Sequence, residues 1–100
     1  MSESQATTDH YTIRRWVEER GGKPATVEGT GGGHAGVLRI DFPGYGEEEK
    51  LRPLGWTEFF EKFDRENLAF LYQDRVESGD ISRFCKFVDR ESVRQQVEQF

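Results

Sequence analysis

The hydrophobic and polar positions of this chain follow one pattern twice, an amphipathic helix followed by two β-rich runs. The first pass extends from about residue 9 to residue 42, and the second from about residue 56 to residue 88. In each helix the apolar residues recur three and four positions apart, whereas the runs that follow alternate or are apolar throughout. The pattern predicts an α+β domain made of two αββ units, in the order αββαββ.

The first helix is predicted to begin at Thr8 or Asp9, either of which can act as an N-cap. Its buried stripe consists of Ile13, Trp16, Val17 and Arg20. Gly21 and Gly22 end the helix, because glycine adopts the left-handed conformation after a helix without a steric penalty, and Pro24 prevents the helix from resuming. A short strand over residues 25 to 28 and a clearer one over residues 37 to 42 are predicted next.

The second helix is predicted between Thr57, its N-cap, and Asn67, which can adopt the left-handed conformation after the last turn. Its apolar stripe consists of Trp56, Phe59, Phe60 and Phe63. The following run, Leu68–Tyr72, is apolar on both faces, which favours a strand in the interior of a sheet. Residues 83 to 88 are predicted to return as the last strand.

These elements predict a two-layer sandwich in which a four-stranded, mainly antiparallel sheet carries both helices on one face. Residues 1–7 are small and polar and are expected to form a disordered tail. One domain is expected over residues 8–90, as suits a chain of 100 residues. Residues 91–100 are expected to form a short C-terminal helix or tail.

The charge of the chain limits the partners that it is expected to bind. Its 14 lysine and arginine residues against 19 aspartate and glutamate residues give a formal net charge of −5. Because a basic surface supplies the affinity for nucleic acids and acidic membranes, binding to either is not expected. The chain has no apolar run near the roughly 20 residues of a membrane-spanning helix and no signal-peptide pattern. A monomeric, acidic, cytoplasmic protein is therefore expected.

Three features that could carry chemistry are interpreted as structural. The glycine-rich stretch from Gly29 to Gly36 joins two predicted strands and lacks the Lys-Ser/Thr pair of a phosphate-binding loop. His10, His34 and Cys85 are not spaced like zinc ligands, so no metal or cofactor is predicted. Cys85 also lies within a predicted strand, where a half-buried thiol is the usual outcome, so no catalytic residue is assigned.

The candidate ligand-binding residues lie on or beside two predicted strands, and they are Arg39, Asp41, Tyr45, Arg83 and Lys86. If both helices cover one face of the sheet, the other face carries Arg39 and Asp41, with Tyr45 just past the strand. Arg39, Arg83 and Lys86 can cluster only if their strands are neighbours and their side chains share a face. Ordinary polar pairing on a wet sheet face is the alternative interpretation.

Three stretches together resemble a family of small uncharacterised bacterial proteins. They are Leu38-Arg39-Ile40-Asp41-Phe42-Pro43-Gly44-Tyr45, then Trp56-Thr57-Glu58-Phe59-Phe60-Glu61-Lys62-Phe63 with Leu68-Ala69-Phe70-Leu71-Tyr72-Gln73, and Ser82-Arg83-Phe84-Cys85-Lys86-Phe87-Val88. The resemblance covers residues 10 to 90, and some members of that family carry the label glucan branching enzyme. Such enzymes are built on a (β/α)8 barrel of about 250 residues, which 100 residues cannot form. The resemblance therefore implies no activity and no site residues.

Three functions are compatible with the sequence. The favoured hypothesis is a non-enzymatic binding or accessory module in the bacterial cytoplasm, whose ligand is an unknown protein or small molecule. A small enzyme would have its site around His34, Arg39, Asp41 and Tyr45. An RNA-binding module would use the open face of the sheet, where aromatic and arginine side chains could stack on bases, although the net charge opposes this. The distribution of charge and hollows on the surface distinguishes the three.

Overall fold

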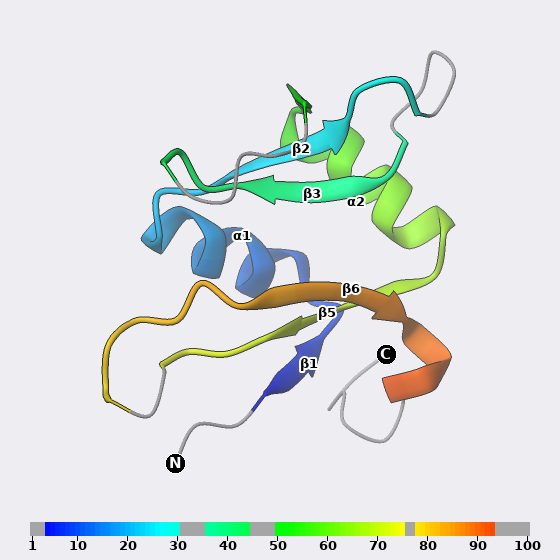
Figure 1. The fold of residues 1–100 in the computed structure, drawn as a ribbon. Helices are drawn as coiled ribbons and strands as arrows, with labels where there is room; N and C mark the ends of the chain where they lie inside the picture. The colour runs from blue at the N-terminus through cyan, green and yellow to red at the C-terminus, as the bar shows by residue number, and fades with distance from the viewer. Residues whose placement is uncertain (1–3, 31–35, 45–49, 76–77, 94–100) are drawn as a thin grey trace.

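The computed structural model describes residues 4–30, 36–44, 50–75 and 78–93, which form an α+β fold with two three-stranded antiparallel sheets. In chain order the elements are β1 (Gln5–Thr7), α1 (His10–Glu19), β2 (Lys23–Val27), β3 (Leu38–Asp41), β4 (Leu51–Pro53), α2 (Trp56–Arg65), β5 (Leu68–Tyr72), β6 (Cys85–Asp89) and the 3-10 helix η1 (Arg90–Val93). One sheet has the order β1-β5-β6 and the other β3-β2-β4. Figure 1 shows the two sheets on opposite sides of α1.

The single four-stranded sheet predicted from the sequence is wrong, because the strands that follow the two helices do not join one another. Instead, β2 pairs with β3 and β4, whereas β5 pairs with β6 and β1. Each sheet thus takes its third strand from the other half of the chain, since β1 precedes α1 and β4 precedes α2. Neither half has a complete sheet of its own.

The two additional strands, β1 and β4, are short edge strands with little hydrophobic pattern. Residues 5–7, expected in a disordered tail, form β1 and pair with β5. β4 ends at Pro53, which an edge strand tolerates because the missing N–H would have pointed away from the sheet. The next residue, Leu54, donates its N–H to the carbonyl of Pro24 at 3.0 Å. Pro24 has no N–H that could donate to the carbonyl of Leu54.

The main core lies between the two sheets and contains side chains of both helices, so the helices do not cover one outer face as predicted. Ile13 and Val17 of α1, Phe59 and Phe63 of α2, and Phe70 of β5 are fully buried. Trp56 and Phe60, predicted in the same stripe as Phe59, are only partly buried.

The predicted interior strand is confirmed, because β5 is the central strand of its sheet and is covered on both faces. Phe70 points into the main core, whereas Ala69 lies with Ala6 of β1 and Val93 of η1 in a second, smaller apolar cluster. The second cluster also explains why residues 90–93 form a helical turn against this sheet. Residues 94–100 of the expected C-terminal helix lie outside the described residues.

The helix ends agree with the sequence in three of four cases. The Asp9 carboxylate caps α1 by accepting the N–H of Thr12 at 2.8 Å. Gly21 and Asn67 adopt the left-handed conformation after their helices, with φ of 71° and 58°. The N-cap of α2 is Gly55 rather than Thr57, so the predicted start of this helix is wrong by two residues.

Candidate functional site

A cavity of about 680 Å³ lies between β3 and β6, which are outer strands of the two different sheets. We call it the β3–β6 groove. Its described lining consists of Arg39, Ile40, Phe42, Arg83, Cys85, Lys86 and Phe87. Ile40, Phe42 and Phe87 form an apolar floor, because all three are partly buried against the main core. The volume falls within the roughly 300–1,000 Å³ typical of ligand pockets.

Three basic residues line this groove: Arg39 of β3, Lys86 of β6 and Arg83 just before β6. The described lining contains no carboxylate. Arg39 lies along its own strand, where one guanidinium nitrogen donates to the carbonyl of Leu38 at 3.0 Å. Lys86 is exposed. A hollow lined by charges of one sign over an apolar floor concentrates the field and attracts ions of the opposite sign.

The structure brings together three of the five predicted ligand-binding residues, but not in the predicted way. Arg39 and Lys86 are not on neighbouring strands of one sheet, and they meet because the outer strands of two sheets border the same cavity. Asp41 does not line the groove, and its register on β3 places it opposite Lys23 of β2. That position fits the alternative interpretation of polar cross-strand pairing. Tyr45 lies outside the described residues.

Cys85 lies in the groove lining but is a poor nucleophile. Burial raises the pKa of its thiol to about 12, and the positive charge of Arg20 opposes this rise only in part. The thiol is therefore protonated at neutral pH, whereas nucleophilic attack requires the thiolate. This agrees with the interpretation of Cys85 as a structural residue.

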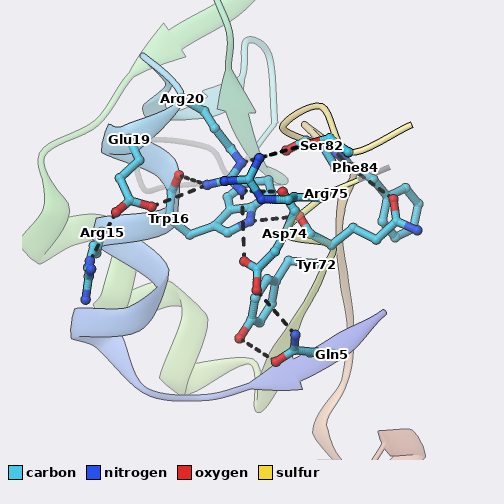
Figure 2. A network of polar contacts seen from close by, with 12 residues as sticks. Gln5, Arg15, Trp16, Glu19, Arg20, Tyr72, Asp74, Arg75, Ser82 and Phe84 are labelled. Carbon is cyan, nitrogen blue, oxygen red and sulfur yellow. Dashed lines mark hydrogen bonds and ion pairs between the residues drawn. The ribbon is translucent and has the colours of Figure 1, made fainter. Parts of the chain in front are cut away.

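Arg20 forms a network of polar contacts with the end of α1 and the segment that precedes β6 (Figure 2). Its side chain is only 4% exposed. Its guanidinium donates to the backbone carbonyls of Ser82 at 2.6 Å, Asp74 at 2.8 Å and Trp16 at 3.0 Å. It also lies over the Trp16 ring, with 4.2 Å between the guanidinium carbon and the ring centroid. The Arg20 side chain is thus buried as predicted, although Arg20 is the C-cap of α1 and not a residue of the helix itself.

The Arg20 network holds the segment that leads into β6 against the end of α1. Arg20 reaches Asp74 and Ser82 at the two ends of this segment, and the Trp16 indole donates to the carbonyl of Gln73 at 3.0 Å. The Ser82 hydroxyl then accepts the N–H of Phe84 at 3.0 Å. Burial lowers the pKa of Arg20, and the carboxylates of Asp74 and Glu19 oppose this shift. The network therefore fixes the backbone on both sides of Arg83.

A second cavity, of about 500 Å³, lies where the two helices meet, but its two basic side chains, His10 and Arg14, already have acidic partners. His10 stacks on Phe60, with ring centroids 4.0 Å apart, and its Nε2 lies 3.0 Å from a carboxylate oxygen of Asp64. Arg14, on the same side, pairs with Glu18 at 3.1 Å. Lys86 in the β3–β6 groove has no such partner among the described residues. The groove is therefore the better candidate for a binding site.

No family model, curated protein or solved structure matches this chain. The resemblance to a bacterial family stays a prediction, and the candidate function rests on the geometry of the groove. Within the described ranges, no helix is long and apolar enough to cross a membrane. In the same ranges, no three His, Cys, Asp or Glu side chains gather as they would around a metal ion. His34 lies outside the described residues.

Proposed function

We propose that this protein is a non-enzymatic binding module that holds an anionic ligand in the β3–β6 groove. The observation that supports this function is the presence of Arg39, Arg83 and Lys86 in the lining of one cavity whose described lining lacks a carboxylate. A carboxylate or phosphate group placed there would form charge-assisted hydrogen bonds, which are roughly twice as strong as neutral ones. The apolar floor would contact the rest of the ligand.

The charge of the whole chain favours a short ligand over a long polyanion. The net charge is −5, so a cavity lined by three basic residues and no described carboxylate is a local exception. A carboxylate or phosphate group within the groove would meet mainly the three cations, whereas an RNA strand would extend beyond them over an acidic molecule. A net charge far from zero also keeps proteins soluble and monomeric, which supports the monomeric state that we propose. The bacterial cytoplasm is the location that we propose for it.

The arrangement of the groove gives less support to the enzyme alternative. Of the residues suggested for an enzyme site, Arg39 lines the groove but Asp41 does not. The one thiol of the described lining, that of Cys85, is held in its protonated form by burial. Binding without covalent chemistry is therefore the function that we propose for this site.

Titration with phenyl phosphate, followed by backbone amide chemical shifts at about 0.15 M salt, tests the proposal. We expect saturable shifts confined to residues 39–42 and 83–87. Replacing Lys86 with glutamate should weaken binding by about tenfold or more, since it removes one attraction and adds a repulsion. Inorganic phosphate should bind more weakly than phenyl phosphate because it cannot contact the apolar floor.

Arg52→Glu is the matched control, because it makes the same change of charge at an exposed position on β4, the opposite edge of the β3-β2-β4 sheet. This variant should bind phenyl phosphate like the unmodified protein. Equal loss in the Lys86 and Arg52 variants would mean that only the overall charge matters. Saturable shifts with short single-stranded RNA, stronger than those with phenyl phosphate, would favour the RNA-binding alternative instead.

A further inference from the structure

We infer that the ligand of the β3–β6 groove is an extended acidic segment of a partner protein, which adds as a strand to the outer edge of β6. The inference rests on the proposed function and names the partner for the same site. Its basis is that the groove combines two features: open backbone hydrogen-bonding groups on a strand edge, and positive side chains beside them. A free small anion would use only the second feature.

The register of β6 shows which of its backbone groups are open. The carbonyl of Phe84 accepts the N–H of Gln73, and the N–H of Arg90 reaches the carbonyl of Asn67. In an antiparallel pair the residues that bond the partner strand alternate, so the even-numbered residues from 84 to 90 bond toward β5. The backbone groups of Cys85 and Phe87 consequently point away from β5.

Both of these residues line the groove, so their outward N–H and C=O groups border it. No described hydrogen bond uses them. Such an edge is a template for another strand. On the opposite side of the groove, β3 offers fewer open backbone groups, because the outward carbonyl of Leu38 already accepts a hydrogen bond from the Arg39 guanidinium at 3.0 Å. The edge of β6 is therefore the better place for an added strand.

Charge complementarity identifies the segment as acidic. A strand lying along β6 would run beside Lys86 and would face Arg39 across the groove. Alternate side chains of a strand point to opposite sides, so acidic residues at every second position would meet the cations while the residues between them meet the apolar floor. In strand addition, the main-chain hydrogen bonds provide affinity and the alternating side chains provide specificity.

Hydrogen exchange with a short peptide that alternates glutamate and valine tests this inference. When the peptide binds, exchange at the amides of Cys85 and Phe87 should slow by about tenfold or more. The amide of Lys86, which bonds toward β5, is the internal control and should change far less. A peptide that alternates lysine and valine should not bind.

Two further acidic peptides carry N-methyl groups on alternate backbone amides. One is methylated at the odd positions and the other at the even positions, so each lacks the N–H donors along one edge of the strand. Loss of binding by about tenfold or more in at least one of them supports strand addition. Equal binding of all three acidic peptides would overturn the inference. Binding of phenyl phosphate without any peptide binding would also overturn it but leave the proposed function standing, whereas failure of both ligands would remove both.

A charged side chain on an open edge can also serve only to prevent aggregation. In that case Lys86→Val should make the protein self-associate, and the acidic peptide should not bind to the unmodified protein. That pair of results would overturn the inference. Peptide binding that is lost in Lys86→Glu and kept in Arg52→Glu is the result that we expect.

Discussion

Arg20 and Lys86 both carry a positive charge close to Cys85, yet their surroundings differ in almost every respect. The Arg20 side chain is 4% exposed, donates to three backbone carbonyls and lies near the carboxylates of Glu19 and Asp74. Lys86 is exposed, and its side chain has neither a hydrogen bond nor an ion pair among the described residues. The first cation joins parts of the chain, whereas the second faces a cavity.

The comparison suggests a criterion for the role of a charged side chain: whether the molecule itself provides a partner for the charge. A buried cation must be paired and hydrogen-bonded, because an unpaired one is costly to remove from water. An exposed cation needs no partner, but several of them around one apolar hollow repel one another and are relieved by an anion. On this reasoning Arg20 contributes to folding, whereas we propose that Lys86, which lines the groove with Arg39 and Arg83, contributes to binding.

The largest expected effect is the loss of stability when Arg20 is replaced by methionine. The change leaves three backbone carbonyls without their donor and removes the contact that joins α1 to the segment before β6. Because hydrogen bonds to charged groups contribute about 1.5–3 kcal/mol each and are not additive, we expect the free energy of unfolding to fall by about 2–4 kcal/mol. Urea unfolding of the variant measures this loss.

Arg52→Met is the control for this prediction, since it removes an arginine of the same size from an exposed position on β4. It should change the free energy of unfolding by no more than about 0.5 kcal/mol. If the two variants unfold at the same urea concentration, Arg20 has no special structural role and the comparison fails.

A comparison of β5 with β1 shows what the sequence could and could not predict about the fold. Residues 68–72 were predicted as an interior strand and form β5, because a run that is apolar on both faces requires cover on both sides. β1 was missed, since its strand is held by backbone hydrogen bonds to β5 and its polar side chains show no pattern. Without the two edge strands, the sequence indicated one sheet instead of two.

The candidate site was predictable in its residues but not in its geometry. Helical spacing predicted Arg20 in the buried stripe of the first helix, and its side chain is buried, although Arg20 is the C-cap of α1. Alternation along the strand pointed Arg39 away from Leu38, which is buried in the core. That Arg39 and Lys86 border one groove depends on the packing of two sheets across both helices, and no local pattern in the chain contains that information.

A smaller effect is expected at Cys85, which lies between the two cations. Because burial raises the pKa of its thiol to about 12, above the ordinary value of 9.0, the thiol favours folding below pH 9. That contribution is lost as the pH rises from 9 toward 12, since the unfolded chain gives up the proton first. The stability difference between the unmodified protein and Cys85→Ala should therefore shrink over this range, as measured by urea unfolding.

At pH 8, Cys85 should also react slowly with Ellman's reagent in the folded protein and rapidly in urea, because only the thiolate attacks the reagent. A fast reaction in the folded protein would mean that the thiol is ionised in the groove. That result would favour a catalytic role for this cysteine. It would also contradict the distinction between the buried cation Arg20 and the exposed cation Lys86.

The smallest expected effect is that of replacing Lys86 with methionine, which removes the charge and keeps most of the side-chain length. Lys86 is exposed and has no described partner, so the variant loses no hydrogen bond or ion pair. Its free energy of unfolding should stay within about 0.5 kcal/mol of the unmodified protein, while its affinity for phenyl phosphate falls. A loss of stability as large as that of Arg20→Met would show that Lys86 is also structural. Unchanged stability together with lost binding is the combination that a purely structural surface charge cannot produce.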